Sequence, residues 1–310
     1  MPLIECVPNV SEGRRADVIA ALGAAVDGPG VHVLDRSSDP SHNRTVYTFA
    51  GEPGAIQDAV LRLFAAAVGA IDLRLHDGVH PRIGAVDVVP FIPLQDATIE
   101  QCVTLAKSTA ALVAERFDVP VFLYEDAAAD DARRSLSEIR RGGLNGVALR
   151  MKQAAWRPDF GPDRPHPTAG ATAIGARPVL IAYNVNLASN RLEVAKRIAS
   201  IIRERSGGLP HVKALGMQLD QGVVQVSMNL TDYKETSMAA VFDAVTREAA
   251  KDGVRVLESE IVGLVPRDAL PPGAARRLKL RDEDLDKVLE TRLEERKNVT
   301  TTEERKANST

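Results

Sequence analysis

The stretch Pro178–Leu187, PVLIAYNVNL, decides the fold, because a strand pattern starts again there after a long irregular segment. Its mostly apolar residues, bounded by a proline and polar residues, predict a strand. Further elements follow in the order helix, strand, strand, helix, strand, at Leu192–Arg205, His211–Leu219, Val223–Leu230, Met238–Lys251 and Val254–Val265. The second half of the chain therefore has the order β-α-β-β-α-β.

The same order precedes Pro178. Strand patterns occupy Leu3–Pro8, Val31–Leu34, Arg44–Ala50 and Ile83–Ile92, and helical spacing of apolar residues occupies Val18–Val26 and Ile56–Ile71. A helix at Thr98–Phe117 and a strand at Val119–Tyr124 come next. This order is typical of ferredoxin-like units. We therefore predict an α+β fold of two β-α-β-β-α-β subdomains with mixed or antiparallel sheets, repeated in topology but not in sequence.

These patterns divide the chain into an N-terminal subdomain at 1–177, a C-terminal subdomain at 178–274 and a charged tail at 275–310. Within the first, Arg140–Arg177 has little regular pattern and is rich in glycine and proline, which is typical of a functional loop or a linker. In the tail about half of the residues are charged. That composition favours a solvated helix ending in a disordered tail, with a docking helix as the alternative.

Composition excludes several classes of protein. The 310 residues are 45% hydrophobic with a net charge of −3, so the chain is not wholly disordered and has no overall attraction to nucleic acid or anionic membranes. Two cysteines, Cys6 and Cys102, cannot form a four-cysteine zinc site and fit a reducing compartment. No apolar run is long enough to span a bilayer, and no secretory signal is visible. We expect a cytoplasmic protein without nucleic-acid or membrane partners.

Standard catalytic and cofactor motifs are missing from the sequence. There is no phosphate-binding loop, no dinucleotide fingerprint and no nucleophile elbow. His76 and His80 are four residues apart, but Gly78 and Pro81 flank them, so a helix presenting both histidines to a metal is not expected. We therefore expect no metal.

Three polar segments could carry chemistry. His80, followed by a proline and then Arg82, suits proton transfer beside an anionic substrate, or it caps a turn. The loop before Arg44 is longer than a hairpin needs, so Arg44 could clamp a carboxylate, or the loop is a solvated turn. Trp156–Gly170, rich in proline, could line a groove for a flat aromatic ligand, or it links domains.

Taken together and in order, four segments resemble the glutamate formimidoyltransferase family, which also forms the formiminotransferase part of formiminotransferase-cyclodeaminases. They are LIECVPNVSEG at 3–13, NRTVYTF at 43–49, HPRIGAVDVVPFIP at 80–93 and AWRPDFGP at 155–162. The similarity covers about residues 3 to 266. The chain leaves no room for a cyclodeaminase domain, so the resemblance implies a single activity.

The resemblance implies transfer of a formimino group from N-formimino-L-glutamate to the co-substrate tetrahydrofolate, in histidine breakdown, by a homodimer with a folate cleft between its subdomains. It also implies His80 as the catalytic general acid/base, with Asp39 as its acidic partner, and Arg44 and Arg82 on substrate carboxylates. The implied folate-binding residues are Gly161, Pro162, Asp163, Arg164, Pro165, His166, Pro167, Thr168, Ala169, Gly170 and Lys213. Two alternatives stay open: cyclisation of 5-formyltetrahydrofolate, and folate binding without catalysis.

Overall fold

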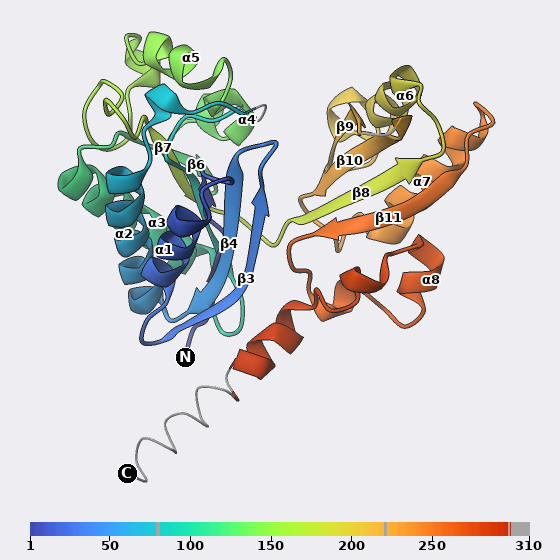
Figure 1. Cartoon of the computed structure of the whole chain (residues 1–310), viewed down its shortest axis with the longest axis horizontal. Coiled ribbons are helices and arrows are strands. Elements are labelled where there is room, and N and C mark those ends of the chain that lie inside the picture. Colours follow the sequence, from blue (N-terminus) through green and yellow to red (C-terminus); the bar gives the residue numbers. More distant parts are fainter. Residues whose placement is uncertain (79–80, 220–221, 297, 299–310) are drawn as a thin grey trace. The chain divides into compact units, whose positions relative to one another are not determined.

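The computed structural model describes residues 1–78, 81–219, 222–296 and 298, and divides into two compact units (Figure 1). The first unit covers Met1–Arg177 and the second begins at Pro178. In the part of the chain that the structure describes, the first unit has a seven-stranded sheet and the second a four-stranded sheet. None of the described helices combines the length and the apolar character needed to cross a lipid bilayer.

The sheet of the N-terminal unit is mixed. Its strands are β1 (Ile4–Cys6), β2 (Asn9–Val10), β3 (Val31–Asp39), β4 (Arg44–Gly51), β5 (Val86–Pro93), β6 (Val121–Glu125) and β7 (Thr172–Ala176). Strands β1 and β2 lie in succession between β4 and β5, β3 pairs outside β4, and all of these pairings are antiparallel. Beyond β5, the strands β7 and β6 continue the sheet in parallel.

Helices cover both faces of this sheet. On one face α1 (Ala16–Val26), α2 (Pro53–Ala70) and α3 (Ile99–Phe117) bury their apolar side chains against the strands. On the other face α4 (Leu136–Ile139) and α5 (Gly143–Arg150) pack on β6 and β7. The segment predicted to be irregular at Arg140–Arg177 therefore contains α5 and the inner strand β7. Alternate residues of β6 face opposite cores, Val121 with α3 and Phe122 with α5.

The C-terminal unit has an antiparallel sheet in the order β11-β8-β10-β9. Its elements are β8 (Ile181–Leu187), α6 (Leu192–Ile202), β9 (Val212–Gln218), β10 (Val224–Leu230), α7 (Met238–Ala250) and β11 (Val256–Val262). In this sheet the fourth strand of the β-α-β-β-α-β unit lies beside the first, the first beside the third, and the third beside the second. The strands β5, β1, β4 and β3 of the first unit have the same arrangement. The predicted α+β fold with a topological repeat is confirmed, and the first unit adds β6, β7 and three helices to it.

Residues after β11 differ from the predicted solvated helix. Leu278 of α8 (Ala274–Leu278), together with Leu289 and Leu293, is buried. Backbone hydrogen bonds join this segment to Val265, which donates to the Lys287 carbonyl and accepts from Leu289. Leu289 and Leu293 supply apolar surface that holds the segment against the unit, which a prediction based on charge alone overlooked.

The face of the C-terminal sheet that points away from α6 and α7 carries polar side chains. Glu258 and Glu260 of β11 accept hydrogen bonds from amides of β8 and β10, at Asn184, Asn186 and Gln225. Arg281 forms ion pairs with both glutamates. The segment after β11 thus places one cation between two neighbouring carboxylates on this face.

Candidate active site

The segment that leads into β5 carries the predicted catalytic histidine. His80 lies outside the described residues, whereas His76, Gly78 and Arg82 on either side of it are described. A Cβ atom at Gly78 would stand only 2.7 Å from the carbonyl oxygen of His42, in the turn between β3 and β4. Only glycine allows these two backbones to approach so closely.

Arg82 links this segment to the β3–β4 turn. Its Nη2 donates to the carbonyl oxygen of His42 (2.8 Å), and its Nη1 donates to Nδ1 of His76 (2.6 Å). Nε2 of His76 in turn donates to the carbonyl oxygen of Asn43 (3.2 Å). Burial, and then the positive charge of Arg82, lowers the pKa of His76, so this imidazole is neutral at neutral pH.

The β3–β4 turn places an acid next to a histidine that the sequence analysis did not select. The carboxylate of Asp39 accepts from the backbone N–H groups of Ser41 (2.8 Å) and His42 (2.9 Å) and pairs with Nδ1 of His42. Partial burial alone would raise the pKa of Asp39, but these bonds from His42 and Ser41 outweigh it, and the pKa is lowered. The signal in the sequence was the spacing of three residues within one turn.

Arg44 begins β4, two residues beyond His42. Among the described residues its guanidinium has no hydrogen bond and no ion pair, although the residue is partly buried. Burial, followed by repulsion from Arg140, lowers the pKa of Arg44. A partly buried cation without a partner among the described residues is a suitable receptor for a carboxylate.

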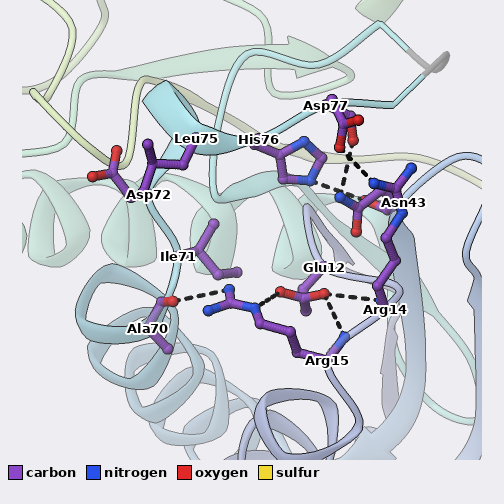
Figure 2. A pocket seen from close by; sticks show the side chains of 10 residues that line it. All are labelled: Glu12, Arg14, Arg15, Asn43, Ala70, Ile71, Asp72, Leu75, His76 and Asp77. Carbon is purple, nitrogen blue, oxygen red and sulfur yellow. Dashed lines mark hydrogen bonds and ion pairs between the residues drawn. The ribbon is translucent and has the colours of Figure 1, made fainter.

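A cavity of about 500 Å³ opens beside this turn, between the start of α1 and the segment that ends at Asp77 (Figure 2). Glu12 accepts from the backbone N–H groups of Arg14 and Arg15 (both 2.9 Å) at its floor. Asn43 bridges the walls, because its Oδ1 accepts from Gly13 N–H (2.9 Å) and its Nδ2 donates to the carbonyl oxygen of Asp77 (2.9 Å). The cavity is thus bounded by the carboxylate of Glu12, by Arg14 and Arg15, and by the neutral imidazole of His76.

The end of the predicted folate loop pairs with the segment that follows Arg82. Ala85 N–H donates to the Ala169 carbonyl (2.9 Å), and Ala171 N–H donates to the Ile83 carbonyl (2.8 Å). Gly170 has a φ of +72°, and a Cβ atom there would stand 2.2 Å from the carbonyl oxygen of Ile83. Two segments that are more than 80 residues apart in the sequence are therefore held at one place in the unit.

The remainder of that loop is anchored by local contacts. His166 accepts at Nδ1 from the backbone N–H of Ala169 (3.0 Å), and exposed Arg164 pairs with Asp118 (3.1 Å). Gly161 lies against Pro120 with a φ of +87°. The loop also contains Pro162, Asp163, Pro165, Pro167 and Thr168.

Lys213 lies on β9 of the other unit and is exposed, so it belongs to a different compact unit from the loop. A group of potential metal ligands also lies in that unit: His211, Asp232 and Glu235 bring one atom each within 4.8 Å of one another. His211 already pairs with Glu235 at 2.9 Å, and an ordinary ion pair accounts for this arrangement.

Two buried ion pairs that the sequence analysis did not identify hold the site segments. Asp159, in the AWRPDFGP segment, pairs with Arg133 (3.0 Å) and accepts from Leu123 N–H (2.8 Å). Asp87 on β5 accepts from Ile83 N–H (2.7 Å) and pairs with Arg140. The two residues of each pair are 26 and 53 positions apart in the sequence, so neither pair could be predicted from local spacing.

Comparison with known proteins gives the same division of the chain. Residues 3–177 match the model of the N-terminal subdomain of the formiminotransferase domain, and residues 182–293 match a second model described as formiminotransferase domain. The chain is 42% identical to glutamate formimidoyltransferase of Streptococcus pyogenes serotype M1, covering 94% of this chain and 98% of that protein. It is 44% identical to glutamate formimidoyltransferase of Thermoplasma acidophilum, covering 96% and 100%.

A longer relative is similar over part of its length. Formimidoyltransferase-cyclodeaminase of Sus scrofa is 45% identical over 88% of this chain, which corresponds to 52% of that protein. With both subdomain models and two relatives matched over nearly their whole length, the chain belongs to the formiminotransferase family.

Proposed function

We propose that this protein transfers the formimino group of N-formimino-L-glutamate to tetrahydrofolate, giving L-glutamate and 5-formiminotetrahydrofolate in histidine breakdown. The observation that carries the proposal is the identity of 42% and 44% with two glutamate formimidoyltransferases over almost their full length. The geometry supports it, because the partly buried Arg44, the Arg82 segment and the end of the predicted folate loop belong to one compact unit.

The proposed reaction moves an amidine carbon between two nitrogens. N5 of tetrahydrofolate attacks that carbon and loses its proton, and the tetrahedral intermediate then expels the glutamate nitrogen, which gains a proton. A histidine suits both steps, because it can accept the first proton as a base and return it as an acid. We assign this role to His80, with Asp39 as the acidic group that stabilises its imidazolium. His76 is less suited, because Arg82 and burial disfavour its protonated form.

The substrates are anionic, and the site residues match that charge. Formiminoglutamate carries two carboxylates, and tetrahydrofolate carries others on its glutamate tail. We assign Arg44 and Arg82 to the donor, because Arg44 lacks a described partner and Arg82 borders the same turn. We assign the loop from Gly161 to Gly170, and Lys213, to the folate.

We further infer that the protein acts as a homodimer in the cytoplasm and needs no metal. The two cysteines, Cys6 and Cys102, are both free and buried, which fits a reducing compartment. Sedimentation of the purified protein measures the oligomeric state. Activity after exhaustive chelation measures the need for a metal, and a loss that Zn²⁺ or Mg²⁺ restores would contradict this inference.

A steady-state assay tests the function and the role of His80 together. Purified protein is supplied with formiminoglutamate and tetrahydrofolate, and the formiminotetrahydrofolate formed is measured. His80→Ala should lower kcat by about 10²–10⁴-fold with folate affinity unchanged. The control is His211→Ala, which removes a histidine of the other unit. Wild-type protein that binds folate without transfer, or that instead cyclises 5-formyltetrahydrofolate with ATP, would refute the function. Near-normal turnover of His80→Ala would exclude His80.

The role of Arg44 is tested through the donor. Arg44→Ala should raise KM for formiminoglutamate by about 10- to 100-fold, the usual worth of a hydrogen-bonded charge pair. Arg36→Ala, which removes an exposed arginine from the neighbouring strand β3, is the matched control. An unchanged KM in Arg44→Ala would exclude Arg44 as a carboxylate clamp.

A further inference from the structure

Arg140 directly follows α4 and reaches a carboxylate near the segment that carries Arg82. Its Nη2 pairs with Oδ2 of Asp87, and the two side chains are only 14% and 4% exposed. The other oxygen of Asp87 accepts from Ile83 N–H (2.7 Å), directly after Arg82. Three residues beyond Arg140, a Cβ atom at Gly143 would lie 3.5 Å from the Arg82 carbonyl oxygen. The α4–α5 segment therefore borders the proposed donor site.

The local balance of charge is positive. Arg44, Arg82 and Arg140 lie near one another, and Asp87 is taken by Arg140. Burial lowers the pKa of Arg44 and of Arg82, and repulsion from Arg140 adds to the lowering in both cases. Asp39 is engaged by His42 and so does not cancel this charge fully. Partly buried cations that repel one another are stabilised by an incoming anion.

The hydrogen bonds of Arg140 also differ from those of a purely structural arginine in the same unit. Arg133 uses both Nη atoms, one on each oxygen of Asp159, with a further bond to the Arg157 carbonyl. Nε of both arginines is buried without a hydrogen-bond partner among the described residues, but Arg140 forms a hydrogen bond there only through Nη2, so its Nη1 is left over. Nη1 of Arg140 thus retains donors that the described residues do not use.

We propose that Arg140, held by Asp87, binds one of the two carboxylates of the formimino donor beside Arg44, and so selects donors that carry two carboxylates. This inference rests on the proposed function and deepens it. Arg140 would then be a specificity-determining residue, supplied by the α4–α5 segment rather than by the segments that resemble the family.

The test compares enzyme variants with donor analogues. Arg140→Gln and the control Arg141→Gln are assayed with formiminoglutamate and with its two monoamides, in which one or the other carboxylate is replaced by an amide. Arg141 is the next residue, is exposed and pairs with Glu138, so its loss removes the same charge from the surface. We expect Arg140→Gln to raise KM for formiminoglutamate by about 10- to 100-fold. KM for tetrahydrofolate should stay at the wild-type value.

The monoamides separate binding from a merely structural role. If Arg140 contacts a carboxylate, its loss costs little with the analogue that lacks that carboxylate and costs the full factor with the other. An equal loss with all three donors, or an equal rise in KM for tetrahydrofolate, would overturn the proposal. If Arg140→Gln fails to fold, Arg140→Lys, which keeps the charge beside Asp87, is assayed in its place. We expect an intermediate KM for formiminoglutamate in Arg140→Lys, and a wild-type KM would also overturn the proposal. A wild-type protein without transfer would remove the proposed function itself.

Discussion

The contact of Gly170 with Ile83 allows a quantitative test of how the predicted folate loop is held. In Gly170→Ala the new Cβ would start 2.2 Å from the Ile83 carbonyl oxygen, which is a backbone atom and cannot rotate away. It would also start 2.8 Å from Cδ1 of Leu73, which can rotate. The backbone at position 170 has a φ of +72°, which side chains other than glycine rarely adopt.

Two costs add up. A left-handed residue other than glycine costs about 1–2 kcal/mol. Relief of the contact must lengthen the hydrogen bond from Ala171 N–H to the Ile83 carbonyl, which is worth about 1 kcal/mol. We therefore expect Gly170→Ala to lower the free energy of unfolding of the N-terminal unit by about 2–3 kcal/mol. KM for tetrahydrofolate should rise as well, because the loop end would be displaced.

The assay is urea unfolding followed by the fluorescence of Trp156, the only tryptophan of the chain, which lies in the N-terminal unit. Its signal reports one unit and avoids a two-state treatment of the whole chain. The control is Gly69→Ala in α2, where an added Cβ would have no atom within 4 Å and should stabilise the helix by up to about 1 kcal/mol. A Gly170→Ala protein with the wild-type midpoint would refute the reasoning.

Buried titratable groups give three further predictions. Burial would raise the pKa of Glu12, but hydrogen bonds from Arg15 and Arg14 outweigh burial and lower the pKa. Its carboxylate therefore stabilises the fold above the ordinary pKa and loses this effect as the pH falls. Glu12→Gln should cost about 1–3 kcal/mol by urea unfolding at pH 7 and little at about pH 3. The pKa of His76 is lowered by burial and by Arg82, so its NMR titration midpoint should lie below about 6.5 and rise in Arg82→Gln; an unshifted midpoint would contradict the described contact. Burial raises the pKa of the Cys6 thiol well above its usual value and that of Cys102 to about 12, so neither should react with a thiol reagent before unfolding, and rapid labelling of the native protein would show the packing to be wrong.

Local pattern was sufficient to predict most of the elements. The apolar residues of α6, at Val194, Ile198 and Ile202, recur at helical spacing and are buried. The strand Arg44–Gly51 alternates in sequence and pairs with neighbours on both sides. Since these signals depend on neighbouring residues alone, the β-α-β-β-α-β order of both units could be predicted.

Long-range contacts could not be predicted in this way. The strand β7 reads TAIGA, whose small residues carry no strand signal, and it forms because it lies between β5 and β6. The pair of Asp87 and Arg140 spans 53 positions. In the site, the sequence selected Arg44 and Arg82 through their loops. The engagement of Asp39 by His42 depends on the fold of the turn, and so do the close approaches at Gly78 and Gly170.

The ion pairs of Arg281 matter for anyone who wishes to produce the C-terminal unit alone. A design that removes the charged stretch from residue 275 onward would discard the guanidinium that joins Glu258 and Glu260, together with the buried Leu289 and Leu293. The shortened fragment would leave two adjacent carboxylates of β11 without this cation, and their repulsion would favour local opening of the strand and proteolysis. A fragment intended for expression should therefore extend through at least Leu293.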